Sequence, residues 1–367
     1  MLSPEEKSRY SRHLLIPEIG EAGQERLQRA SVLLIGTGGL GSPAALYLAA
    51  AGVGRLGLVD PDTVDLSNLQ RQLLHSDATI GMAKLDSAAA RLRETNPHIT
   101  LDLHRVRFSP ENAIQIAESY DIIIDGSDNF PTRFLANDTA FFLKKPLIYG
   151  AIQRFDGQMT VFAPHLAGGC YRCLLPEIPL PGLVPSCSEA GVLGVLPGII
   201  GTLQAMEAIK LILGIGQAPF GKLTIYEALS SSFRAIKLPH DPACRLCGSA
   251  PSIFSVTNSE TTSSISCSTM QSITAAELKT RLETGELNAL LIDVREHDEW
   301  QVVNIPQARL VPLQTLPNYV PSLPKDTQII IHCKAGMRSA KACEYLSSIG
   351  FEDVVNVTGG MDAFQKL

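Results

Sequence analysis

Four cysteines occur as two close pairs, Cys170 with Cys173 and Cys244 with Cys247. Two thiolates in C-x₂-C spacing can reach one metal ion from a single short turn, and two such pairs complete a tetrahedral site. Because four protein ligands leave no position for water, the ion would be structural. Disulfides or inert buried thiols are the alternatives. The spacing therefore predicts a Cys₄ zinc site.

A glycine-rich turn, GTGGLG, runs from Gly36 to Gly41 between an apolar run and a helical pattern. Such a turn lets backbone N–H groups approach phosphates at a helix N-terminus. Asp60 ends the next apolar run and can hydrogen-bond a ribose hydroxyl. Taken alone, these residues favour an NAD-binding fold, and a purely structural turn is also possible.

Polar residues follow directly after Asp60, in the segment DTVDLSNLQRQLLH, and Lys84 begins a helical pattern a little later. Arg71 and Lys84 converging on one nucleotide would suit a triphosphate, whose charge increases during transfer. A dinucleotide's two phosphates usually need only the glycine turn. The alternative is that both cations are solvated surface charges. The cluster shifts the interpretation from NAD to ATP.

The segment DGSDN, Asp125 to Asn129, ends another buried strand, where open α/β sheets form their ligand crevice. The Asp128 carboxylate offers the hard oxygen ligands that Mg²⁺ prefers. Alternatively, Asp128 caps a helix that begins near Pro131. The segment therefore predicts a magnesium ligand beside the phosphates.

Cys333 opens a second chemical loop, CKAGMR, between a strand and a helix. Loop N–H groups and the helix dipole would favour a thiolate there, and Arg338 would add positive charge. A tyrosine-phosphatase loop needs five residues between its cysteine and arginine, whereas only Lys334 to Met337 intervene here. The smaller ring favours a persulfide over a phosphate.

The elements that must position these residues read as α/β throughout. Short apolar runs alternate with helical patterns from ASVLLIG at residue 30 to YDIIIDG at 120, as in βαβ units, and polar-alternating strands and the helix LQAMEAIKLILG follow. A second α/β unit carries AAELKTRLETGE, ALLIDVR, QIIIHC, RSAKACEYLSSIG and VVNV. We expect one domain over residues 1–250, a Ser/Thr-rich linker over 251–271, and a small domain over 272–367.

Bulk properties limit the class of protein. The net charge of −6 argues against non-specific nucleic-acid binding. The N-terminus lacks the apolar core of a signal peptide, and the longest apolar stretch, near Val192 to Gly201, is interrupted by Gly and Pro and is too short for a bilayer. We therefore expect a cytoplasmic protein without membrane or nucleic-acid partners, in which paired cysteines bind metal.

Residues 8–248 resemble the molybdopterin-synthase adenylyltransferases of the MoeB/ThiF group, relatives of the ubiquitin-activating enzymes. The resemblance implies a Rossmann-like adenylation domain that uses ATP and Mg²⁺ and carries structural Zn²⁺. It implies nucleotide contacts from Gly39, Asp60, Ser67, Asn68, Leu69, Gln70, Arg71, Lys84, Asp128 and Asn129. Arg71, Lys84 and Asp128 would serve catalysis, and Arg12 would be supplied across a homodimer interface.

The partner implied by this family is a ubiquitin-like sulfur carrier with a C-terminal Gly-Gly, whose carboxylate attacks the α-phosphate of ATP. Residues 272–367 resemble rhodanese, with LIDVRE at 291–296 and GGMDAF near the end as further signatures. We expect Cys333 to carry a persulfide taken from a cysteine desulfurase or thiosulfate. The expected product is a thiocarboxylate for molybdenum cofactor or a related biosynthesis.

Cys187 lies in a proline-rich stretch, LLPEIPLPGLVPSCSE, that reads as an exposed loop. It matches the second reactive cysteine of sulfur-transferring relatives. It could resolve an acyl disulfide, hold the carrier as a thioester, or simply be exposed. Two other classes of function remain open at this point: an NAD-dependent oxidoreductase with redox C-x₂-C pairs, and a non-enzymatic platform for a ubiquitin-like partner.

Overall fold

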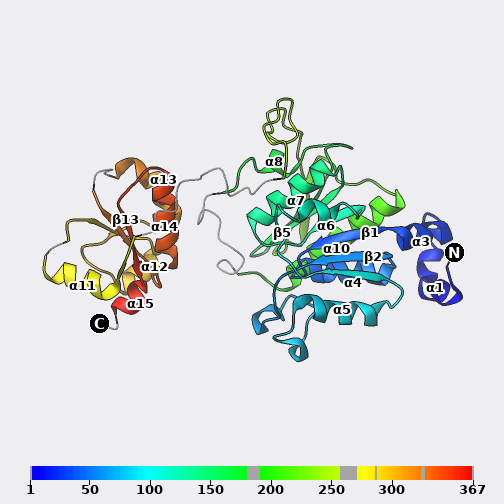
Figure 1. Cartoon of the computed structure of the whole chain (residues 1–367), viewed down its shortest axis with the longest axis horizontal. Coiled ribbons are helices and arrows are strands. Elements are labelled where there is room, and N and C mark those ends of the chain that lie inside the picture. The colour runs from blue at the N-terminus through cyan, green and yellow to red at the C-terminus, as the bar shows by residue number, and fades with distance from the viewer. Residues whose placement is uncertain (1, 180–190, 257–270, 286, 324–326, 366–367) are drawn as a thin grey trace. The chain divides into compact units, whose positions relative to one another are not determined.

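The computed structural model describes residues 2–179, 191–256, 271–285, 287–323 and 327–365. They divide into two compact units, the first over residues 2–178 and 191–256 and the second over 271–365 (Figure 1). Cys187 and most of the expected linker, residues 257–270, lie outside the described residues.

The first unit is built on an eight-stranded sheet in the order β3-β2-β1-β4-β5-β6-β7-β8. Strands β1 to β5 pair in parallel, and β5 to β8 pair antiparallel. The strands are β1 Ser31–Ile35, β2 Arg55–Val59, β3 Thr100–His104, β4 Ile122–Asp125, β5 Leu147–Gln153, β6 Asp156–Phe162, β7 Lys222–Glu227 and β8 Ser232–Lys237. The α/β fold class is thus confirmed.

The helices of this unit lie before β1, after each of the parallel strands β1 to β4 as the alternating sequence pattern predicts, and between β6 and β7. They are α1 Pro4–Arg9, α2 Ser11–Leu14, α3 Gly20–Arg29, α4 Gly41–Ala51, α5 Lys84–Thr95, α6 Ala113–Ala117, α7 Phe130–Phe142, α8 Tyr171–Leu174 and α10 Val195–Leu213. The strand order reverses between β1 and β4, which places the end of β1 next to the end of β4. Open α/β sheets bind their ligands at this switch point.

Helix α10 corrects one prediction. The sequence predicts that the apolar stretch near Val192 to Gly201 is interrupted by Gly and Pro, but a continuous helix begins at Val195 and runs to Leu213. Pro197 lies in its first turn, where the missing N–H costs nothing. By length and composition this helix could cross a membrane, yet it packs against α4, β5 and β6 and buries residues such as Leu196, Ile200 and Ala208. It is a core helix of the unit.

The second unit contains a parallel five-stranded sheet in the order β11-β10-β12-β13-β9. Its strands are β9 Gln271–Thr274, β10 Leu290–Asp293, β11 Arg309–Leu310, β12 Ile329–His332 and β13 Val354–Thr358. Its helices are α11 Ala275–Glu283, α12 His297–Val302, α13 Leu316–Tyr319, α14 Met337–Ser348 and α15 Gly360–Phe364. Apolar clusters cover both faces of the sheet.

Two glycine substitutions measure how closely the chain packs at the switch point. A Cβ on Gly41 would lie 2.0 Å from the Gly36 carbonyl oxygen, whereas a Cβ on Gly198, inside α10, would meet nothing within 4 Å. We expect Gly41→Ala to destabilise the protein by about 1–3 kcal/mol through overpacking. Gly198→Ala should be neutral or slightly stabilising because alanine favours helix. Thermal unfolding of both variants measures the difference, and equal melting temperatures would contradict the close approach.

Candidate functional site

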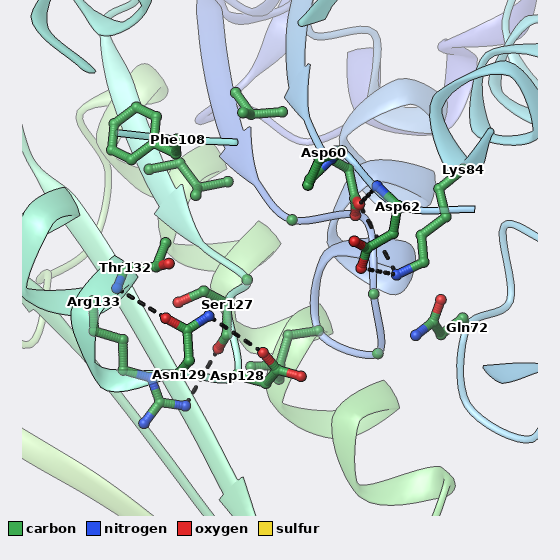
Figure 2. Close-up of a pocket in the computed structure, with 18 of the residues that line it drawn as sticks. Asp60, Asp62, Gln72, Lys84, Phe108, Ser127, Asp128, Asn129, Thr132 and Arg133 are labelled. Atoms are coloured by element: carbon green, nitrogen blue, oxygen red, sulfur yellow. Dashed lines mark hydrogen bonds and ion pairs between the residues drawn. The ribbon is translucent and has the colours of Figure 1, made fainter. Parts of the chain in front are cut away.

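A cleft opens at the carboxyl ends of β1, β2 and β4, and side chains from two sides face it (Figure 2). The glycine turn after β1 forms its base, and Gly36 takes a left-handed conformation with φ 93°. Of the residues expected to contact the nucleotide, the structure places these around the cleft: Gly39, Asp60, Arg71, Lys84, Asp128 and Asn129. Ser67, Asn68, Leu69 and Gln70 are not among the lining residues.

Asp60 is buried and ties the glycine turn to the end of β2. One carboxylate oxygen accepts hydrogen bonds from the backbone N–H and the hydroxyl of Thr37, both at 2.9 Å. The other accepts from the Asp62 N–H at 3.0 Å. Each oxygen therefore already has a partner within the protein. A ribose contact from Asp60 stays a prediction, and the observed bonds give this residue a second task in shaping the turn.

Lys84 is the first residue of α5, and its ammonium group reaches back to the end of β2. Nζ lies 3.0 Å from Asp62 Oδ2 and 3.9 Å from Asp60 Oδ1. The lysine side chain is buried, whereas Asp62 is exposed. An ammonium held by a solvated carboxylate can exchange that partner for a phosphate oxygen at small cost. Sequence reasoning did not single out Asp62.

Arg71 and Gln72 come from the turn after a short 3₁₀ helix, η1 Leu66–Asn68. Arg71 donates to the Ser67 carbonyl at 3.0 Å and lines the cleft close to Gly39. Gln72 is buried, and its Oε1 has no hydrogen-bond partner among the described residues. A buried amide oxygen without a partner costs free energy, so this side chain is suited to a ligand's donor group.

Asp128 does not cap the following helix. The cap of α7 is Asn129, whose Oδ1 accepts from the Thr132 N–H at 3.0 Å, and the helix begins at Phe130. Asp128 is exposed in the cleft, with Asn129 Nδ2 at 3.5 Å as a weak contact. Unlike Asp60 and Asp62, it has no ion pair within the described parts of the chain. An unpaired carboxylate in a cleft that the glycine turn also lines fits a magnesium ligand.

Asp125 and Arg133 form a buried charged layer beneath Asp128. Asp125 Oδ1 accepts from the Ser127 N–H at 2.9 Å and the Ser127 hydroxyl at 2.6 Å. Arg133 Nε lies 4.0 Å from Asp125 Oδ2, and its Nη2 donates to the Ser127 carbonyl at 3.3 Å. Burial raises the pKa of the Asp125 carboxyl, and the nearby Arg133 opposes that rise. No sequence pattern points to Arg133, because its role depends on which face of the helix is buried.

Four cysteine sulfurs form a compact cluster, with all four Sγ atoms within 4.8 Å of one another. The Sγ atoms of Cys170 and Cys244 are 3.7 Å apart, and those of Cys173 and Cys247 are 3.4 Å apart. A tetrahedron of sulfurs around zinc has edges of about 3.8 Å when the Zn–S bonds are about 2.3 Å. The donor set and spacing therefore fit a Cys₄ metal ion.

In the second unit, Cys333 follows β12 and is almost fully buried. Its Sγ accepts from the Gly336 N–H at 3.2 Å and the Ser339 hydroxyl at 3.4 Å. The N–H groups of Met361 and Asp362 hold the carbonyls of Cys333 and Lys334 at 2.8 and 2.9 Å. The GGMDAF segment therefore fixes the loop that surrounds the thiol.

Arg338 does not add free positive charge to this loop. Its guanidinium makes a two-point contact with the Glu299 carboxylate of α12, at 2.6 and 2.7 Å. Hydrogen bonds from Arg338 lower the pKa of Glu299 to about 2. The charges of Arg338 and Glu299 therefore cancel. The hydrogen bonds that Cys333 Sγ accepts come from an N–H group and a hydroxyl group. Glu299 was missed because it lies 39 residues from Arg338 in the sequence.

A buried ion pair supports the strand before the loop. Arg295 contacts Asp293 through both Nε and Nη2, and His332 Nε2 lies 3.7 Å from Asp293. Burial lowers the pKa of His332 to about 4, so the imidazole beside Cys333 is neutral. The LIDVRE segment thus contributes a buried ion pair to the core of the second unit.

Arg12 stands apart from the cleft. It lies exposed in α2 and is not among the lining residues. That Arg12 reaches the site of a partner chain across a homodimer interface stays a prediction. Every role expected of Cys187 also stays a prediction. Cys343, a further thiol in α14, is buried, which raises its pKa to about 12.

Two families match the chain: the ThiF family over residues 10–246 and the rhodanese-like domain over residues 274–367. The probable adenylyltransferase/sulfurtransferase MoeZ of Mycobacterium tuberculosis is 44% identical over 376 residues, covering 100% of this chain and 94% of its own. The sulfur carrier protein adenylyltransferase of Thermus thermophilus is 51% identical over 251 residues, covering 67% of this chain and 93% of its own.

Among solved structures, E. coli MccB superposes with a TM-score of 0.58 at 21% identity, covering 67% of this chain and 73% of its own. That likeness concerns the fold alone. The sequence relatives decide between the functions that the glycine turn left open, because both are named for adenylyl transfer and the M. tuberculosis relative is also named for sulfur transfer. The chain belongs to the ThiF family, carries a C-terminal rhodanese-like domain, and is an adenylyltransferase and sulfurtransferase.

Proposed function

We propose that the first unit adenylates the C-terminal glycine of a ubiquitin-like sulfur carrier and that the second unit supplies the sulfur. The observation that carries this proposal is the unpaired Asp128 facing Lys84 and Arg71 across the cleft at the sheet's switch point. Cations and a free carboxylate on opposite sides suit a magnesium-bound triphosphate. The M. tuberculosis relative pairs the same two activities in its name.

The adenylation step is an in-line displacement at phosphorus. The carrier's carboxylate oxygen attacks the α-phosphorus of ATP, the bond to the β-phosphate bridging oxygen breaks, and pyrophosphate leaves. Bound Mg²⁺, held by Asp128, would neutralise charge on the phosphates. Lys84 exchanges Asp62 for a phosphate oxygen, and Arg71 binds a second phosphate beside the glycine turn. The products are a carrier acyl-adenylate and pyrophosphate.

Sulfur transfer follows at the activated carbonyl. A Cys333 persulfide, loaded by a cysteine desulfurase or by thiosulfate with release of sulfite, attacks the acyl-adenylate and displaces AMP. The Gly336 N–H and the Ser339 hydroxyl stabilise the sulfur anion before attack. A second thiol, from Cys187 or an external reductant, attacks Cys333 Sγ in the acyl disulfide. The carrier thiocarboxylate leaves, and two further thiols, which are themselves oxidised to a disulfide, reduce the new disulfide.

The context of the reaction is part of the same proposal. We infer that the segment expected as a linker over residues 251–271, which meets β9 at Gln271, keeps the persulfide at high local concentration near the adenylate. The protein would act as a cytoplasmic homodimer with Arg12 of each chain completing its partner's site. The thiocarboxylate would serve molybdenum cofactor or a related sulfur-containing product. A carrier mass that gains the difference between sulfur and oxygen only with ATP tests reaction and partner together.

Replacing the cleft's free carboxylate should separate adenylation from sulfur chemistry. We expect Asp128→Asn to reduce carrier-dependent ATP–pyrophosphate exchange by roughly 10²–10³-fold, because it removes a charged ligand that acts on the reacting phosphates. Persulfide loading of Cys333 should be unchanged. Asp156→Asn, an exposed carboxylate outside the cleft, is the matched control. Equal exchange rates in both variants would exclude Asp128 from the magnesium site.

Replacing Cys333 should abolish sulfur transfer and leave adenylation unchanged. Cys333→Ala removes the sulfur carrier atom, so thiocarboxylate formation should fall to background while ATP–pyrophosphate exchange stays at the wild-type rate. Intact-mass measurement of the carrier and radiolabel exchange measure the two steps. Cys343→Ala, in the same unit, should preserve both. A Cys333→Ala variant that still forms thiocarboxylate would place the sulfur elsewhere.

The cysteine cluster should hold about one zinc ion per chain, because four thiolates complete its coordination. Elemental mass spectrometry of the purified protein measures this ratio. Cys244→Ser should lose the metal and lower the melting temperature of the first unit, while Cys343→Ala should keep the metal. A fully folded and active protein without a stoichiometric metal ion contradicts the assignment.

A further inference from the structure

The Cys333 loop contains an ion pair that the proposed reaction does not use. Arg338 lies in the first turn of α14 and Glu299 lies in α12, and the guanidinium meets the carboxylate at two points, at 2.6 and 2.7 Å. Cys333 Sγ accepts its hydrogen bonds from other donors of the same loop, the Gly336 N–H and the Ser339 hydroxyl. The one arginine of the segment CKAGMR is thus occupied by a protein carboxylate.

The Glu299 carboxylate is held by its own helix as well as by Arg338. Its Oε2 also accepts from the Glu296 N–H at 3.1 Å, which closes the N-terminal cap of α12. Both contacts favour the charged form, and the pKa of Glu299 is lowered to about 2. Glu299 is therefore a carboxylate throughout the neutral pH range, and Arg338 keeps its partner there.

This pair is more enclosed than the pair that Lys84 forms in the cleft of the first unit. The side chains of Arg338 and Glu299 are 30% and 26% exposed, whereas Asp62, the partner of Lys84, is 61% exposed. An anion that took Arg338 would leave a partly buried carboxylate unpaired, which costs more than leaving a solvated one. An incoming anion therefore displaces Glu299 less readily than it displaces Asp62.

The other charges of the loop and of the helix turn that contacts it do not restore a positive site. Lys334 is exposed and has no ion pair in the parts of the chain that the structure describes. A solvated lysine attracts an anion only weakly. Two exposed acids, Glu296 and Asp298, stand at the start of α12 beside Glu299. Negative charges therefore outnumber positive ones in these two segments.

Two classes of sulfur donor differ in charge. In thiosulfate, a dianion, the Cys333 thiolate attacks the outer sulfur, the sulfur–sulfur bond breaks, and sulfite leaves with the electron pair. In a persulfide, R–S–S⁻, the thiolate attacks the terminal sulfur and R–S⁻ leaves. Both steps produce the same Cys333 persulfide. Because Coulomb attraction scales with charge, neutralising Arg338 removes more attraction for the dianion than for a singly charged persulfide.

We propose that Glu299 is a specificity-determining residue for sulfur transfer, which acts through Arg338. By holding this arginine, it makes the Cys333 loop discriminate against thiosulfate in favour of the persulfide of a donor thiol. Glu299 does not touch the reacting sulfur. Because Cys333 is the proposed persulfide carrier, this role of Glu299 rests on the proposed function, and it adds the chemical class of the donor.

The test uses the full-length protein carrying Glu299→Gln, which keeps the shape of the side chain and removes its charge. Thiosulfate and cysteine persulfide are the two donors, and peptide mass spectrometry follows the rate at which Cys333 gains one sulfur atom. We expect the rate with thiosulfate to rise roughly tenfold, because the released Arg338 can donate charge-assisted hydrogen bonds to its oxygens. The rate with cysteine persulfide should change by less than about threefold.

Salt gives a second readout, which a purely structural role of Glu299 would not move. Loading of Glu299→Gln from thiosulfate should slow as salt is added, because ions screen the attraction between Arg338 and the dianion. The wild-type rate should respond much less. Adding Arg338→Gln to Glu299→Gln should remove both the gain and the salt response. If Glu299→Gln does not fold, a strong salt response of the wild type with thiosulfate still contradicts the proposal.

Asp298→Asn is the matched control. Asp298 directly precedes Glu299, is exposed, and has no ion pair within the described ranges. Its Oδ1 accepts from the Glu299 N–H at 2.9 Å, and asparagine keeps this acceptor. This variant loses one negative charge, as Glu299→Gln does, but leaves Arg338 paired. We therefore expect it to load from both donors at the wild-type rates.

The proposal is overturned if the wild type loads from thiosulfate as fast as from cysteine persulfide, since there is then no discrimination to explain. Equal gains in Glu299→Gln and Asp298→Asn would assign the effect to the general charge of α12. An unchanged thiosulfate rate in Glu299→Gln, or slower loading from both donors, would leave Glu299 a purely structural role. If Cys333 takes sulfur from neither donor in the wild type, the proposed function fails, which is a separate result.

Discussion

The cleft at the sheet's switch point depends on one buried carboxylate, that of Asp125 at the end of β4. It is fully buried, and its Oδ2 has no hydrogen-bond partner among the described residues. Such a group is costly unless a cation lies near, and Arg133 at 4.0 Å provides it. In return, Asp125 Oδ1 binds both donors of Ser127 and closes the turn that presents Asp128. Arg133 is therefore paired with Asp125, and Asp128 stays exposed in the cleft without an ion pair among the described residues.

Packing around this pair explains the long apolar helix α10. Gln204 of α10 donates to the carbonyls of Asp125 and Ile148 at 2.8 and 3.2 Å, at the ends of β4 and within β5. A Cβ on Gly150 would lie 2.7 Å from this amide, so the strand must approach the helix closely there. The helix thus supports the end of β4 from within the core. Its apolar composition reflects burial against the sheet.

Sequence order was enough to predict the positions that follow parallel strands, because the carboxyl ends of such strands meet at one edge. Asp60, Lys84 and Asp128 are therefore near one another as expected. What could not be predicted depends on side-chain direction. One residue of offset in the start of α7 makes Asn129 the cap. Glu299 pairs with Arg338 across 39 residues, a separation with no local pattern.

Each unit places a strand-to-helix turn at its candidate site, but the charged side chains beside the two turns differ. Gly36 and Gly336 both adopt φ near 93°, so each turn can direct backbone N–H groups inward. In the first unit Lys84 is held by an exposed carboxylate that a phosphate can displace. In the second, Glu299 and Arg338 are already matched, which leaves Sγ with neutral donors. A phosphate at the first turn would therefore meet a displaceable cation, whereas Cys333 Sγ at the second turn meets the uncharged donors of Gly336 and Ser339.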